Sequence, residues 1–344
     1  MSLGSIIVGE SMLAPAPQLS DAMRLGRARR RARPNVSFTE PYTPVSRGLA
    51  QLGEHQLDKL VSAPGAMCGE CPHSGQLDLS ARTDAPTPGW SAMPEIEAIS
   101  TLTPSNVTGR ALRHFLTFTM ALDRARDSTA LWNASARLFN EHSLVFEPSE
   151  VTLADKYEVG ALLREYSVSQ RHGPDCDAWL RIAHSLTDRA APEINIAIET
   201  GAGDAADLLE AVQRIGHDGT TLFPLLRGQK IAPVWVRILV YPGKATLSSL
   251  ETVSIAVDVH TRRVTENLGL TATAGEDLER VRGAIQDAWA AEVQATGAAG
   301  PPGLENTPAA LDPALWFFGK WGCSFCETQG QRVPIADACG GCRL

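Results

Sequence analysis

The chain has 344 residues, with 31 lysines and arginines against 39 aspartates and glutamates, so its formal net charge is -8. Hydrophobic residues make up 44% of the chain and charged residues 20%, which is ordinary globular composition and excludes fibrous, collagen-like and wholly disordered proteins. At about 150 residues per domain, the length allows one large domain or two small ones. No run of about 18 apolar residues and no secretory signal is present, so we expect neither a membrane span nor export.

Residues 1–92 differ in composition from the rest of the chain. They contain many prolines, serines and glycines, which interrupt regular secondary structure, and a basic run from Arg24 to Arg33. They show no sustained helical period. We expect a disordered tail here, with a basic arm for DNA as the alternative. The stretch Ser46–Leu60 resembles the peptide produced when a bacterial tRNA gene is translated; if it is one, the protein itself begins near Met93. Cys68 and Cys71 are interpreted as an accidental pair.

From about residue 105 the apolar residues follow helical spacing. The segment Val253–Val257 is either a short strand or the lead-in to a helix, and Ala298–Thr307 is a glycine- and proline-rich linker. We therefore predict an all-α fold, with a helical domain over residues 93–318 and a separate loop over residues 319–344. The predicted helices are Asn106–Arg126, Ser128–His142, a helix capped by Thr152, Pro174–Asp188, Asp204–Ile215, Gly228–Tyr241, Asp258–Leu268, Gly275–Thr296 and Pro308–Gly319.

The stretch most informative about chemistry is residues 223–269. It contains Gly228-Gln229-Lys230-Ile231-Ala232, a glycine–lysine turn that opens a strongly apolar helix, and then Val257-Asp258-Val259-His260, in which an aspartate opens the next helix. These two pieces resemble the hairpin and the catalytic-aspartate motif of the helix-hairpin-helix DNA glycosylase superfamily, which includes endonuclease III and the 8-oxoguanine glycosylases. Two departures from the family's LPGVGxKxA pattern are Leu225 and Leu226, which replace its proline and first glycine.

The resemblance implies a DNA base-excision glycosylase with Asp258 and Lys230 as catalytic residues. Cleavage of a glycosidic bond builds positive charge on the sugar, and a carboxylate at Asp258 would stabilise that charge. A lysine attacks the sugar only as a free amine, so we expect the apolar residues after Lys230 to bury it. The resulting imine would allow strand cleavage at the abasic site, whereas without an active lysine water would displace the base. The longer separation from Lys230 to Asp258 implies an enlarged loop around Pro242–Leu250.

The same resemblance implies a double-stranded DNA partner. Backbone amides at a helix N-terminus form a phosphate-binding site, so the candidates for DNA contact are Arg227, Gly228, Gln229 and His260. Of these, His260 is more typical of a structural partner of the aspartate's helix than of a general base. We expect a monomer located in the bacterial cytoplasm, at the nucleoid.

The C-terminal loop carries four cysteines in the pattern Cys323-x2-Cys326-x12-Cys339-x2-Cys342. The paired spacing taken alone is typical of tetrahedral Zn²⁺. Four thiolates also hold a 4Fe–4S cluster, and the endonuclease III-type enzymes end in a cluster loop, although their spacing is C-x6-C-x2-C-x5-C. We predict a 4Fe–4S cluster with Zn²⁺ as the alternative, and a structural role for either. Cys176 is expected to be a buried core thiol.

Two other functions remain open from the sequence. A nucleoside or nucleotide N-glycosidase on the same scaffold would keep Asp258 but would need no DNA-binding hairpin. A non-catalytic nucleic-acid- or protein-binding module would use the helices and the four-cysteine loop without turnover. The identity of the excised base is not readable, because base pockets are assembled from residues scattered along the chain.

Overall fold

The computed structural model of the protein describes residues 93–104, 107–267, 270–271, 275–298, 300–317 and 319. The predictions made for residues 1–92 and for the four cysteines of the C-terminal loop lie outside the described residues. No helix within the described ranges is long and apolar enough to cross a membrane.

Helix dominates the described residues, so the predicted all-α class is confirmed. The α-helices are α3 (Pro94–Ser100), α4 (Gly109–Ala121), α5 (Ser128–His142), α6 (Pro148–Leu153), α7 (Lys156–Glu165), α8 (His172–Thr187), α9 (Pro192–Thr200), α10 (Ala205–Ala211), α11 (Ile231–Val240), α12 (Val259–Asn267), α13 (Leu278–Thr296) and α14 (Asp312–Phe317). Short 3₁₀ helices are η2 (Ser143–Phe146), η3 (Leu250–Thr252) and η4 (Pro308–Leu311). Two three-residue strands are β1 (Ala202–Asp204) and β2 (Thr246–Ser248).

Several predicted helix boundaries require correction. The capping residue in the 150s is Asp155, which accepts hydrogen bonds from the backbone N–H groups of Tyr157 and Glu158 at the start of α7, whereas Thr152 lies inside α6. An aspartate binds these unpaired amides more effectively than a threonine. The strand alternative for Val253–Val257 is wrong, because this segment is an irregular lead-in to α12.

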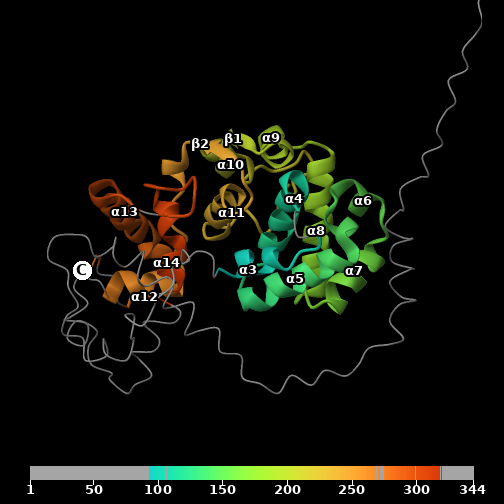
Figure 1. Ribbon diagram of the computed structural model, residues 1–344, viewed down its shortest axis with the longest axis horizontal. Coiled ribbons are helices and arrows are strands. Elements are labelled where there is room, and N and C mark those ends of the chain that lie inside the picture. Colours follow the sequence, from blue (N-terminus) through green and yellow to red (C-terminus); the bar gives the residue numbers. More distant parts are fainter. Residues whose placement is uncertain are drawn as a thin grey trace, which may run out of the picture.

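Helix α11 lies between two groups of helices, with α3 to α8 on one side and α12 to α14 on the other (Figure 1). Nearly all of α11 is buried, as expected for a helix that is apolar on every side except at Arg237. Its Trp235 is fully buried and donates a hydrogen bond from Nε1 to Thr117 Oγ1 of α4 at 3.0 Å. The packing holds both ends of α11 in fixed positions, including the N-terminal end that carries Lys230.

The enlarged loop expected around Pro242–Leu250 is an ordered part of the fold. It contains β2, which pairs in parallel with β1. Asp204 joins the two segments, because its side chain accepts hydrogen bonds from the hydroxyl groups of Ser249 and Ser248 and from the N-terminal amides of α10. These hydrogen bonds, that of Ser249 foremost, lower the pKa of Asp204 to about 2. The loop is therefore held against β1 and the start of α10.

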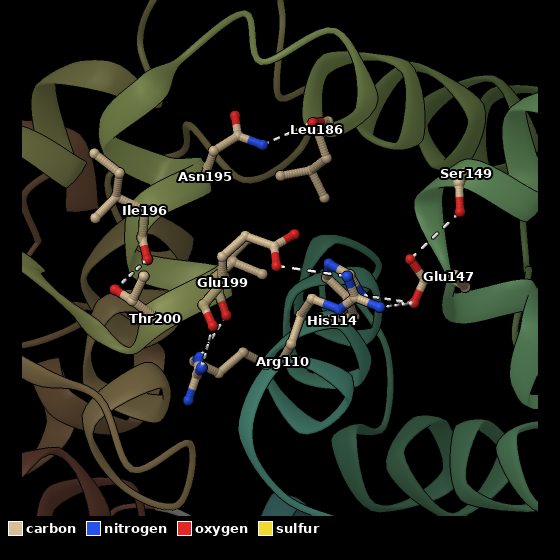
Figure 2. Close-up of polar contacts among 11 residues, drawn as sticks. Arg110, His114, Glu147, Ser149, Leu186, Asn195, Ile196, Glu199 and Thr200 are labelled. Carbon is tan, nitrogen blue, oxygen red and sulfur yellow. Dashed lines mark hydrogen bonds and ion pairs between the residues drawn. The ribbon is translucent and has the colours of Figure 1, made fainter. Parts of the chain in front are cut away.

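A polar cluster ties α4 to α6 and α9 (Figure 2). Arg110 forms ion pairs with Glu147 at 3.3 Å and with Glu199 at 3.5 Å, and the buried His114 places Nδ1 3.6 Å from Glu147 Oε2. The close approach of His114 is the main cause of the lowered pKa of Glu147. None of these four side chains lines the cavity described below, so the cluster is assigned a role in holding helices together.

Candidate functional site

The structure brings Lys230 and Asp258 into direct contact. Lys230 is the residue immediately before α11, and Asp258 is the residue immediately before α12. Lys230 Nζ lies 2.8 Å from Asp258 Oδ2. The lysine side chain is 43% exposed and the aspartate side chain 13% exposed, so the pair faces solvent on the lysine side. The burial of Lys230 expected from its apolar neighbours is therefore only partial.

Asp258 is held in place by the helix that it begins. Its Oδ1 accepts hydrogen bonds from the backbone N–H groups of His260 and Thr261, at 2.9 and 3.1 Å, which leaves Oδ2 for Lys230. Burial by itself raises the pKa of Asp258, but the charge of Lys230 and these hydrogen bonds outweigh it and hold the pKa below its usual value. Asp258 is therefore ionised at neutral pH, as a group that stabilises a cation must be.

A small cavity of about 60 Å³ opens beside this ion pair. Its walls come from α3, the end of α4, α5, α11, α12 and α14, and they include the indole rings of Trp132 and Trp316. The charged residues that line it are Glu95, Asp123, Lys230, Arg237, Asp258 and Asp312. Four carboxyl groups against two cations make the cavity formally acidic.

A second ion pair lines the same cavity and is sealed from solvent. Arg237 Nη2 lies 2.7 Å from Glu95 Oε1, and both side chains are less than 5% exposed. Asp312 lies on the other side of Arg237, with its Oδ2 3.8 Å from Nε, and its Oδ1 accepts a hydrogen bond from Ala256 N–H at 2.7 Å. Complete burial raises the pKa of Asp312 to about 6.

Asp123 follows the end of α4 and is held by two uncharged donors from α5. Its Oδ1 accepts a hydrogen bond from Ser128 Oγ at 2.8 Å, and its Oδ2 accepts one from Trp132 Nε1 at 3.1 Å. Burial is the main cause of its raised pKa. The sequence did not indicate that Glu95, Asp123, Arg237 and Asp312 line a common site. Acidic residues beside helix ends are common, and an arginine within an apolar helix matches no known motif.

The residues predicted to contact DNA lie just before α11. Arg227, Gly228 and Gln229 are exposed, and the side chain of Gln213 donates a hydrogen bond to the carbonyl oxygen of Arg227 at 2.8 Å. A Cβ atom added to Gly228 would meet no atom closer than 3.9 Å, so the backbone here is open to an incoming group. The connection from α10 to α11 spans residues 212–230 and is no tight hairpin. In it Leu225 adopts a φ of 69°, a left-handed conformation that glycine adopts at lower cost.

His260, the remaining DNA-contact candidate, packs beside the cavity. Its ring is partly buried, and its centroid lies 6.4 Å from that of Trp316 in an edge-on arrangement. Burial is the main reason that its pKa is lowered, so the neutral imidazole is favoured. This placement beside Trp316 agrees with a structural interpretation of His260.

The described residues hold no group of three or more His, Cys, Asp or Glu side chains arranged to bind a metal ion. The four cysteines predicted to hold a cluster lie outside these residues. Cys176 is buried, which confirms the prediction of a core thiol, and burial raises its pKa.

Comparison with known proteins gives no match to a family model, to a curated protein or to a solved structure. The resemblance to the helix-hairpin-helix glycosylases therefore rests on the two sequence pieces around Lys230 and Asp258 and on the C-terminal cysteine loop. Function must be argued from the geometry of the site.

Proposed function

We propose that the protein is a DNA glycosylase of the helix-hairpin-helix type, which removes a damaged or modified base and also cuts the resulting abasic site. The single observation that carries the proposal is the 2.8 Å contact between Lys230 Nζ and Asp258 Oδ2 at the edge of a cavity. A lysine, once it has lost its proton, and an ionised carboxylate beside it are the two groups that lysine-dependent cleavage of a glycosidic bond requires.

The chemistry assigns one task to each group. As the bond between the base and C1′ of the sugar breaks, the Asp258 carboxylate stabilises the positive charge on the sugar. Lys230, after releasing a proton, forms a bond from Nζ to C1′, and the departing base takes up a proton. The imine that follows on ring opening permits β-elimination, which breaks the bond between C3′ and its phosphate oxygen.

The exposed segment before α11 supplies the proposed contact with DNA. Arg227 contributes a positive charge, and the open backbone at Gly228 and Gln229 leaves room for a phosphate at the N-terminus of α11. A phosphate bound there would be held by the residues that directly precede Lys230 in the sequence. Non-specific attraction of this kind weakens steeply with salt, so binding should be measured at low ionic strength first.

The target base has to leave the helical stack before it can reach the site. Ligand pockets of proteins usually measure about 300 Å³ or more, so the cavity of about 60 Å³ is too small for a base as it stands. We therefore expect its walls to move when DNA binds. The part-exposed side chains of Lys230 and Trp316 lie on walls that can do so without breaking the core.

Borohydride trapping tests the proposal. Borohydride reduces an imine and leaves the protein covalently attached to DNA, so the full-length protein incubated with an abasic duplex should give an adduct that Lys230→Ala loses. Lys156→Ala is the matched control, because Lys156 is an exposed lysine of α7 outside the cavity. An adduct that survives in Lys230→Ala, or no adduct and no base release on any of a panel of modified bases, would contradict the proposal.

A nucleoside N-glycosidase is the second candidate for this site. The long connection between α10 and α11, with Leu225 and Leu226 in place of the family's proline and glycine, favours it, because such an enzyme needs no tight DNA-binding hairpin. Release of base from free nucleosides, together with an absence of duplex binding at low salt, would support this candidate over the first.

We also propose that the four-cysteine loop holds a 4Fe–4S cluster, with Zn²⁺ as the alternative. A brown protein whose colour is lost in Cys339→Ser would support the cluster. A colourless protein that contains zinc would support the alternative.

A further inference from the structure

The carboxyl groups that line the cavity differ in what holds them. Asp258 pairs with Lys230, and Glu95 pairs with Arg237. Asp123 forms no ion pair with any residue in the described part of the chain, and it is oriented by Ser128 and Trp132, which are uncharged. Its remaining hydrogen-bonding capacity is therefore not committed to a neighbouring cation.

The two donors fix the carboxyl group of Asp123 in one orientation. Ser128 and Trp132 are four residues apart at the start of α5, so they lie on the same side of that helix. Trp132 is only 1% exposed, which holds its indole N–H in place. Each oxygen of a carboxylate accepts about two hydrogen bonds, so each oxygen of Asp123 keeps one acceptor position. Because Asp123 lines the cavity, these positions are within reach of a group that enters it.

We propose that Asp123 recognises the base by accepting a hydrogen bond from its exocyclic amino group. Bases that carry this amino group are then preferred over analogues without it. The proposal rests on the proposed function, since a base enters this cavity only if the protein cleaves the bond between a base and its sugar. A site whose acceptor is left without a donor binds an analogue poorly, because the unpaired polar group stays desolvated.

Matched pairs of lesions isolate the amino group. The probes are duplexes that contain 8-oxoguanine or 8-oxohypoxanthine, and 5-hydroxycytosine or 5-hydroxyuracil, at one position in the same sequence. For at least one pair, the wild-type protein should release the amino-bearing base about tenfold faster, in kcat/KM, than its partner. Asp123→Asn should reduce that ratio to about one or invert it, because the amide group turns toward the base as a donor.

The substitution is conservative for the fold. The amide oxygen of asparagine still accepts from Trp132 Nε1, and its NH₂ group can donate to Ser128 Oγ. Ser128→Ala is a second variant that removes only one of the two orienting donors, and it should reduce the ratio in the same direction but less. Asp127→Asn is the matched control, because Asp127 is an exposed capping residue of α5 that does not line the cavity, and it should leave the ratio as in the wild type.

Cleavage of a preformed abasic site distinguishes recognition of the base by Asp123 from other roles of Asp123, since that substrate has no base. Asp123→Asn should lower release of the amino-bearing base about tenfold more than it lowers abasic-site cleavage. Equal losses in both reactions, or an amino-group ratio that is unchanged by Asp123→Asn, would overturn the inference while leaving the proposed function intact. A wild-type protein that releases no base and forms no adduct would instead remove the proposed function, and the inference with it.

Discussion

The two ion pairs that line the cavity have nearly the same geometry and very different exposure to solvent. The joining distances are 2.8 Å for Lys230–Asp258 and 2.7 Å for Arg237–Glu95. Solvent reaches the first pair, whereas the second is almost completely enclosed. Glu95 or Arg237 left alone in the enclosed pair would be a buried unpaired charge, which is costly, whereas Lys230 left alone in the open pair would be hydrated and Asp258 left alone would keep its two backbone hydrogen bonds. Exposure, more than distance, therefore separates the pair that supports the fold from the pair available to a substrate.

The largest expected effect is on stability and concerns the enclosed pair. Arg237→Met would leave Glu95 and Asp312 buried without the guanidinium, and the free energy of unfolding should fall by about 3–5 kcal/mol. Lys230→Met is the matched change in the open pair, and it should cost clearly less than Arg237→Met, because Asp258 keeps its two backbone hydrogen bonds and part of its contact with solvent. Urea denaturation of both variants measures the difference, and similar losses for the two would contradict the distinction drawn between the pairs.

The opposite ranking is expected for activity, where the open pair matters most. Asp258→Asn should lower base release on the order of 100- to 1,000-fold, because the carboxylate charge that stabilises the sugar cation is lost. The folded state should be little affected, since asparagine caps α12 as well as aspartate does. Asp277→Asn, the same change at the cap of α13, is the control for capping alone. Full base release by Asp258→Asn would remove Asp258 from the mechanism.

The raised pKa of Asp312 predicts that the stability of the protein depends on pH. Measuring this dependence tests whether Asp312 is enclosed together with the Arg237–Glu95 pair. The folded protein keeps a proton on Asp312 up to about pH 6, which the unfolded chain releases near pH 4. The free energy of unfolding should therefore decrease as pH rises from about 4 to 6, by up to about 3 kcal/mol from this group. Asp312→Asn should lack this contribution. Chemical denaturation of both proteins across the window measures it, and parallel curves would show that Asp312 titrates normally.

The smallest effect on stability is expected for the exposed ion pairs of Arg110, which lie outside the cavity. Arg110→Ala removes the ion pairs with Glu147 and Glu199 (Figure 2), and the arginine side chain is half exposed. The free energy of unfolding should fall by less than about 1 kcal/mol, and the difference from the wild type should shrink in high salt. A loss as large as that of Arg237→Met would show that solvent exposure does not rank ion pairs in this protein.

Local signals predicted much of the helical framework. The expected range Ser128–His142 has the same bounds as α5, and the expected range Asp204–Ile215 contains α10, which ends earlier, at Ala211. Such signals succeed because caps and apolar faces act over one or two helical turns. Helices α3, α6 and α9, which begin at Pro94, Pro148 and Pro192, were missed because they are short.

The candidate site was predicted only in part. Lys230 and Asp258 were singled out from their motifs, and the structure places them in contact. Asp123 was not singled out, because nothing in its immediate sequence distinguishes it from a residue that ends a helix. Its role follows from Ser128 and Trp132, which lie on the next helix and face it only after α4 and α5 pack.

The sequence by itself determined the helical class and most helix positions and pointed to Lys230 and Asp258 as candidates, since these depend on side-chain type and short-range spacing. The tertiary structure alone decided which charges share a cavity, which of the two ion pairs meets solvent and which acid lining the cavity forms no ion pair among the described residues. Those properties depend on the desolvation of groups from α3, α5, α11, α12 and α14, and desolvation is set only when these helices, distant in the chain, pack together.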